Sequence, residues 1–154
     1  MAEQLVNEFT VNRPIDEAWA TLTDVERIAP CLPGAELTEI ASDDDGDVYR
    51  GVVKIKLGSI TPKFQGQARF LERDDAADGA VLKAEGRDTG GRGNAAAEIT
   101  ATASSLSPTA TKVSVVTDLH ITGKVAQFGG RGIMADVSKK LMEQFSGNLN
   151  QMLD

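Results

Sequence analysis

The chain is poor in the residues that most often perform catalysis or cross-link a fold. It has one cysteine, Cys31, and one histidine, His120, among 154 residues. A single cysteine excludes an intramolecular disulfide and a cysteine metal cluster, and it fits a reducing compartment. A lone histidine has no second imidazole with which to share a metal ion.

Long apolar runs are also missing. No stretch approaches the roughly 18 apolar residues that a membrane-spanning helix needs. The start of the chain, MAEQLVNEF, has no basic segment followed by an apolar run, so we expect no signal peptide. These absences predict a cytoplasmic protein.

Positive charge is scarce as well. The net charge is -7 and the pI is about 4.7. A nucleic-acid-binding protein would need a basic face for phosphates, so this class is excluded, as is simple electrostatic docking on an anionic membrane. With 41% apolar residues, residues 1–154 are expected to form one globular domain with its own core.

What the chain does have is a series of strands with unusually small side chains on one face. Between residues 94 and 105, Glu98, Thr100 and Thr102 alternate with Ala97, Ile99 and Ala101. The same alternation recurs in residues 64–70 and 80–86. Protein interiors are close-packed, so a face of alanine and glycine leaves volume that a helix or a ligand must fill.

The pattern predicts a strand at 3–11, two short helices at 15–22 and 25–29, six strands and a long helix at 132–153. Short turns separate the strands, so neighbours should pair antiparallel. A curved sheet of about seven strands cannot bury its concave face alone, and the last helix is the element long enough to cover it. The six strands are expected at 37–41, 48–57, 62–73, 80–89, 94–106 and 111–122.

Three segments of the sequence resemble those of a known family. They are residues 24–34 (DVERIAPCLPG), 53–66 (VKIKLGSITPKFQG) and 123–132 (GKVAQFGGRG). Together they resemble the G subunit of carbon monoxide dehydrogenase, a family of the START-related (SRPBCC) superfamily. The resemblance implies an α+β helix-grip fold, in which a curved seven-stranded antiparallel sheet wraps around the C-terminal helix.

The resemblance also implies a role. The G subunit is an accessory to molybdenum hydroxylases such as carbon monoxide dehydrogenase, and it links them to the membrane without binding molybdenum, flavin or iron–sulfur clusters. We therefore expect a location at the inner face of the cell membrane. The contact would be transient or would use a C-terminal tail, which some family members have and this sequence does not include.

Individual candidates for chemistry have ordinary interpretations. His120 falls on the outer face of its strand, and Cys31 is expected to be a buried small residue. Residues 43–45 form an acidic turn, and Asp88 is the one titratable group expected near the cup. Because no positioned proton carrier is evident, we expect neither catalytic nor metal-binding residues. Residues 129–132 are expected to be a hinge, with Phe128 placed to gate the opening of a cavity.

The leading hypothesis is a carrier of a hydrophobic molecule. The cargo would be a respiratory quinone, menaquinone or ubiquinone, or another lipid, because the implied partner releases electrons that must reach the membrane. Two alternatives remain: a docking subunit without cargo, and a small cyclase- or hydratase-like enzyme. Ligand sites are concave and mostly apolar. The predicted lining consists of Tyr49, Val53, Ile55, Phe64, Ala68, Phe70, Leu82, Ala84, Ala97, Ile99, Ala101, Leu119, Phe128, Ile133, Met134, Val137, Leu141 and Phe145.

Overall fold

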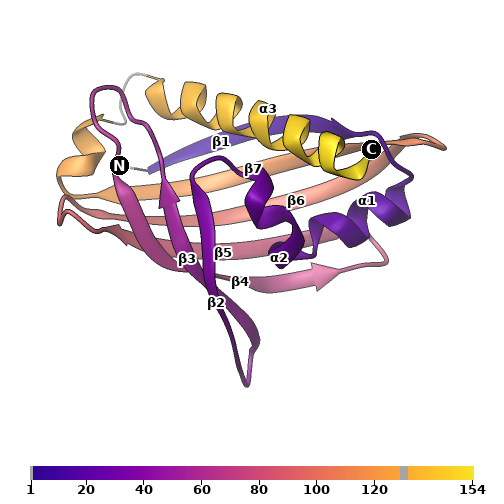
Figure 1. The fold of residues 1–154 in the computed structure, drawn as a ribbon, viewed down its shortest axis with the longest axis horizontal. Coiled ribbons are helices and arrows are strands. Elements are labelled where there is room, and N and C mark those ends of the chain that lie inside the picture. Colours follow the sequence, from indigo (N-terminus) through magenta and orange to yellow (C-terminus); the bar gives the residue numbers. More distant parts are fainter. Residues whose placement is uncertain (1, 129–131) are drawn as a thin grey trace.

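A computed structural model describes residues 2–128 and 132–154, and Figure 1 shows one sheet with helices on its concave side. The long helix α3 lies along strand β1, and α1 and α2 lie across the open end of the sheet. The elements in chain order are β1 (Ala2–Val11), α1 (Ile15–Leu22), α2 (Val25–Ile28), η1 (Ala29–Cys31), β2 (Ala35–Asp43), β3 (Gly46–Lys54), β4 (Lys63–Asp74), β5 (Gly79–Asp88), β6 (Asn94–Ser107), β7 (Ala110–Thr122), η2 (Lys124–Phe128) and α3 (Ile133–Leu153).

The seven strands form one antiparallel sheet in the order β1-β7-β6-β5-β4-β3-β2. The pairing aligns the small residues across strands, with Ala97 between Ala84 and Leu119. On β6 the outward residues Glu98, Thr100 and Thr102 are exposed, as their alternation predicts. The predicted order of elements and the predicted helix-grip architecture are confirmed.

The predicted boundaries agree with the structure to within two residues, with one exception. The strand expected at 48–57 ends at Lys54, because residues 57–60 close a tight turn in which Leu57 and Ile60 exchange backbone hydrogen bonds. Leu57 is fully buried in that turn. Leu57 fitted the apolar alternation of the strand because its side chain is also buried in the core. It enters the core from a turn, however, and not from a strand.

Three glycines lie in one row across neighbouring strands. Gly51 pairs with Gly66, which pairs with Gly86. A Cβ atom added at Gly66 would lie 1.8 Å from the carbonyl oxygen of Glu85, and one added at Gly51 would lie 2.3 Å from that of Glu36. The backbones therefore approach more closely along this row than a side chain allows, which lets the sheet curve toward α3.

The helices α1 and α2 are positioned by local signals at the end of β1. Pro14 precedes the first turn of α1, where a backbone N–H would have no partner within the helix, so its lack of an N–H costs no hydrogen bond. Asp16 and Glu17 lie at the positive end of the helix. Asp24 caps α2 by accepting a hydrogen bond from the Arg27 amide. The inward face of α1 buries Ala18 and Trp19.

The core is divided into two clusters at opposite ends of α3. The first cluster packs around the N-terminal end of α3, and its buried members are Leu5, Leu57, Phe64, Ile121, Val125 and Met134. The second packs around the C-terminal end, and its buried members are Val11, Ala18, Cys31, Val113, Phe145 and Leu149. The middle of the concave face therefore lies between two well-packed ends.

We predict that Gly66→Ala destabilises the protein by about 1–3 kcal/mol, the range for forcing extra volume into packed structure. The added Cβ would meet the backbone of Glu85, which cannot rotate away as a side chain could. Gly79→Ala is the matched control, because its added Cβ meets nothing closer than 3.9 Å. Urea unfolding of both variants measures the difference. Equal stabilities would show that close strand approach does not require Gly66.

Candidate functional site

The candidate site is the middle of the concave face, which we call the central wall. Its side chains share the concave face of the sheet with the buried Phe64 and Ala80, but each stays partly exposed, unlike the buried members of the two core clusters. The central wall consists of Tyr49, Val53, Ala68, Phe70, Leu82, Ala84, Ala97, Ile99 and Ala101. An apolar surface that is enclosed by packed ends yet accessible to solvent is typical of a ligand site.

The predicted lining residues divide between this wall and the core clusters. The residues Ile55, Phe64, Leu119, Phe128, Met134 and Val137 pack in the first cluster. Phe145 packs in the second cluster, edge-on to Phe9 with ring centroids 5.7 Å apart. On α3, Ile133 and Leu141 are partly exposed. The predicted lining residues that pack in the two core clusters are mostly large, whereas the predicted alanines all lie on the central wall, beside Tyr49, Phe70 and Leu82.

A pocket of about 340 Å³ lies at one end of the central wall, between α1–α2 and strands β2–β4. It combines one cationic side chain, Arg73, with three carboxylates, Asp24, Glu26 and Asp47. We call it the mouth pocket. Its lining residues are Ala20, Thr23, Asp24, Val25, Glu26, Ile40, Asp47, Tyr49 and Arg73.

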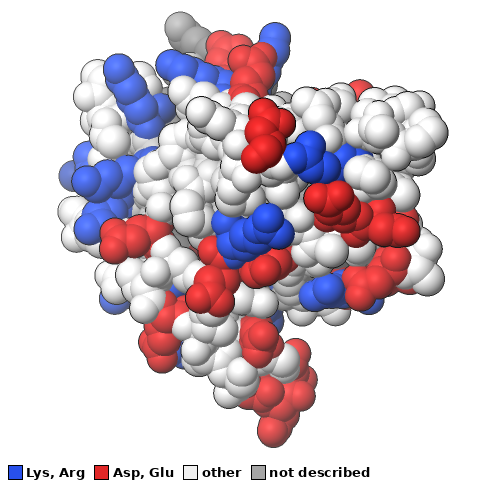
Figure 2. All heavy atoms as spheres, turned by 45° about the vertical axis from the view of Figure 1, so that its right-hand side comes forward, with Lys and Arg blue, Asp and Glu red and all other residues white. Residues whose placement is uncertain are grey.

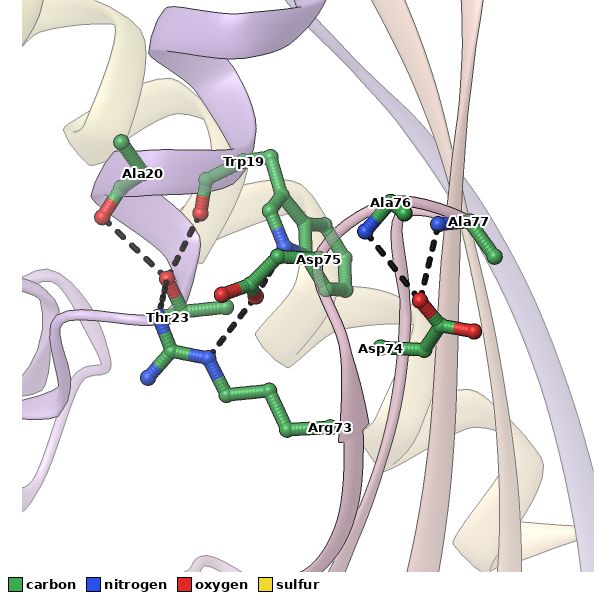
Figure 3. A network of polar contacts seen from close by, with 8 residues as sticks. All are labelled: Trp19, Ala20, Thr23, Arg73, Asp74, Asp75, Ala76 and Ala77. Carbon is green, nitrogen blue, oxygen red and sulfur yellow. Dashed lines mark hydrogen bonds and ion pairs between the residues drawn. The ribbon is translucent and has the colours of Figure 1, made fainter.

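Arg73 is held in the mouth pocket by a network of polar contacts (Figure 3). Its Nε donates to Asp75 at 2.9 Å, and one terminal nitrogen donates to the Thr23 hydroxyl at 3.2 Å. The indole N–H of Trp19 donates to the same Asp75 oxygen at 2.9 Å. The network ties β4 to α1, and these contacts lower the pKa of Asp75, with Arg73 as the larger cause.

Sequence reasoning missed Arg73. The register of β4 against β5 shifts between Phe70 and Glu72, so Arg73 pairs with the inward-facing Ala80 instead of continuing the outward series. A bulge of this kind re-aims the side chains that follow it. A one-residue irregularity leaves no mark in the alternation of apolar residues, so strand periodicity alone could not have found this arginine.

Tyr49 joins the mouth pocket to the central wall. Its ring packs edge-on against Phe70 with centroids 6.4 Å apart, and the guanidinium of Arg73 lies 5.6 Å above the Phe70 ring. Burial raises the pKa of Tyr49, and the charges of Asp47 and Asp24 raise it further, against an opposing effect of Arg73. At neutral pH the hydroxyl therefore stays protonated and can donate a hydrogen bond.

The remaining candidates have structural roles. Cys31 is buried in the second cluster beside the Met152 sulfur, and burial raises the pKa of its thiol, which disfavours the thiolate. His120 is exposed on the outer face, as predicted. The acidic turn is exposed at the protruding tip of the β2–β3 hairpin, where acidic side chains gather (Figure 2). There Arg69 pairs with Asp43 and Asp45.

The predicted hinge falls mostly outside the described residues, because residues 129–131 are not among them. Phe128, the predicted gate, ends η2 and packs against the first cluster. Gly132 precedes the first residue of α3. The expected gating role of this segment stays a prediction.

The model of one family, the G subunit of carbon monoxide dehydrogenase (CoxG), matches residues 8–154. The chain belongs to the CoxG family. No curated protein sequence matches the chain.

Solved structures confirm the helix-grip fold of this CoxG family member. A conserved protein from Geobacillus kaustophilus superimposes with a TM-score of 0.82 at 17% identity, covering 98% of this chain and 95% of that one. The ZhuI aromatase/cyclase from Streptomyces sp. R1128 gives 0.67 at 17% identity, with 99% and 93% covered. Norcoclaurine synthase from Thalictrum flavum gives 0.66 at 14% identity, with 99% and 87% covered. At these identities the likeness concerns the fold alone.

Within residues 2–128 and 132–154 of this CoxG family member, none of the helices has the length and hydropathy of a membrane span.

The titratable group predicted near the cup, Asp88, lies at the end of β5 and outside the central wall. Its buried carboxylate accepts hydrogen bonds from the Arg92 side chain, the nearest at 2.6 Å, and from the Lys63 and Arg92 amides. Asp88 thus closes the β5–β6 hairpin and is not available to a ligand on the wall.

The Asp88–Arg92 contact predicts a specific pH dependence of stability. Chiefly through its hydrogen bond from Arg92, the pKa of Asp88 falls to about 2, below the ordinary value of about 3.9 for an unfolded chain. The contribution to stability is therefore complete above about pH 4 and is lost as the pH falls toward 2. Asp88→Asn should melt below the parent at pH 7, and the difference in Tm should shrink between about pH 4 and 2.

Melting curves across this pH range test the assignment, with Asp44→Asn on the exposed hairpin tip as the control. The control should melt with the parent throughout. A deficit of Asp88→Asn that stays constant down to pH 2 would contradict the ionic origin of the contact.

Proposed function

We propose that the protein is a non-catalytic carrier of a hydrophobic molecule, with a respiratory quinone as the cargo. The observation that carries the proposal is the central wall, an apolar face that remains partly exposed between two packed clusters. An apolar chain laid on this face would remove its surface from water at a gain of roughly 25 cal/mol per Å². Transfer from lipid to such a site would then need little net free energy.

The shape of the wall favours an elongated, unbranched or methyl-branched chain. Its small side chains, Ala68, Ala84 and Ala97, lie side by side on three neighbouring strands. Two larger residues, Phe70 and Leu82, border them on the side of the mouth pocket. The prenyl tail of menaquinone or ubiquinone has these properties, and an acyl chain shares them.

Family membership supports a specific partner. The family is named as a subunit of carbon monoxide dehydrogenase, so we propose that the chain serves a molybdenum-containing hydroxylase of this type. Such an enzyme releases electrons that a water-insoluble quinone can receive only if something brings the two together. A carrier that visits the inner face of the cell membrane transiently would supply that step.

Two other functions compete with a carrier. Enzymes such as an aromatase/cyclase and a synthase share the fold, but acid–base chemistry needs a positioned proton carrier. The central wall holds Tyr49 as its one titratable side chain, and the pKa of that group is raised. A docking subunit without cargo could use the partly exposed apolar wall as a contact surface, and binding experiments separate it from a carrier.

Filling the wall should weaken binding. We predict that Ala97→Phe weakens the binding of a decyl-tailed quinone at least about tenfold, or roughly 1.4 kcal/mol. The new ring would occupy the space in which the tail lies. The fold should survive, because added volume costs about 1–3 kcal/mol even in closed cores. Calorimetric titration with decylubiquinone measures the affinity, and Ala101→Phe provides a second test.

Thr100→Phe is the matched control, because Thr100 lies on the same strand but points to the exposed outer face. It should bind the quinone as the parent does. If Ala97→Phe and Ala101→Phe also bind like the parent, the cargo does not lie on the central wall. If the parent binds no quinone or lipid at all, the docking function replaces the carrier.

A further inference from the structure

The mouth pocket offers hydrogen-bond donors that have no partner in the part of the chain that the structure describes. Among the described residues the Tyr49 hydroxyl makes no hydrogen bond, although its ring is packed against Phe70. Arg73 uses its Nε and one terminal nitrogen for Asp75 and Thr23. Figure 3 shows its other terminal nitrogen directed away from both partners. The two donors line the same pocket of about 340 Å³.

The charge around these donors selects the kind of group they can hold. Asp24, Glu26 and Asp47 line the pocket, and Asp75 already compensates the charge of Arg73. A carboxylate or phosphate would meet net repulsion from the carboxylates, and a cationic head would have no lone pair with which to accept a hydrogen bond from Tyr49 or Arg73. A neutral oxygen acceptor, such as a ketone or quinone carbonyl, gains two hydrogen bonds without either conflict.

The pocket adjoins the wall at Tyr49, which lines the pocket and is also a wall residue. Tyr49 pairs with Ala68, and Phe70, which contacts both Tyr49 and Arg73, pairs with Leu82. A molecule whose head lies between Tyr49 and Arg73 therefore has its tail directed past Phe70 onto the alanines of the wall. The hydrogen-bond donors of the mouth pocket thus lie next to the apolar surface of the central wall.

We infer that the mouth pocket is the head-group site for an amphiphile with a neutral carbonyl head, held by the Tyr49 hydroxyl and the free terminal nitrogen of Arg73. This inference rests on the proposed carrier function and adds its specificity: quinone-type heads are accepted, and anionic lipid heads are rejected. The chain orientation follows, with the head near α1 and the tail running toward the first core cluster.

The test compares two probes with alkyl tails of nearly equal length, decylubiquinone and decanoate, by calorimetric titration of the intact chain. Tyr49→Phe keeps the ring against Phe70 and removes one donor, and Arg73→Met removes the other. Each should raise the Kd for decylubiquinone about tenfold, the loss expected for one hydrogen bond in a sheltered site. Neither should change the Kd for decanoate. Arg50→Met, an exposed arginine of β3 paired with Glu39, is the control and should bind like the parent.

Trp19 gives a second readout. It is the only tryptophan, and its indole lies against Asp75, one contact away from Arg73. A quinone head in the mouth pocket should quench its fluorescence, and Tyr49→Phe should require more quinone for the same quenching.

The outcomes distinguish a failure of the head-group site from a failure of the carrier function. A parent that binds decylubiquinone, with unchanged affinity in both variants or with equal or tighter binding of decanoate, would overturn the head-group site and leave the carrier standing. A parent that binds neither probe would overturn the carrier function itself.

Discussion

The close approach of strand backbones along the row Gly51–Gly66–Gly86 is the constraint on which the rest of the structure depends. Any side chain at Gly66 would overlap the backbone of β5. Without a Cβ atom in this row the sheet can curve across β3, β4 and β5. The curvature gives the sheet a concave face, and α3 lies along that face beside β1.

A concave face must still be filled or remain accessible, and this protein does both. Large side chains such as Phe64 and Phe145 complete one core cluster at each end of α3. Between them the wall has the partly exposed alanines Ala68, Ala84 and Ala97. The fully buried apolar side chains lie at the two ends. Under the proposed function, a guest would cover the middle with its own apolar surface.

Much of this arrangement could be predicted from the sequence, and the failures have physical reasons. Alternation along residues 94–105 identified the inner face correctly, because period-two patterning reports directly which side of a strand is buried. The apolar repeat of the last helix predicted α3 to within one residue at its start. The family resemblance, carried by three segments, is confirmed over residues 8–154.

The interpretation of the small residues was only partly right, because Gly66 was expected to leave volume for a ligand, whereas a neighbouring backbone occupies that space. The mouth pocket was missed altogether, since it depends on a bulge in β4 and on α1 approaching from elsewhere in the chain. Such long-range geometry has no local signature.

The central claim is that this chain carries a hydrophobic molecule on its wall, and native mass spectrometry of the protein purified from cells with their own quinones tests it most directly. The account predicts one quinone per chain, recovered in organic extracts of the parent and of Thr100→Phe but absent from Ala97→Phe. Parent protein that is consistently empty, or Ala97→Phe protein that retains the same molecule, would contradict it.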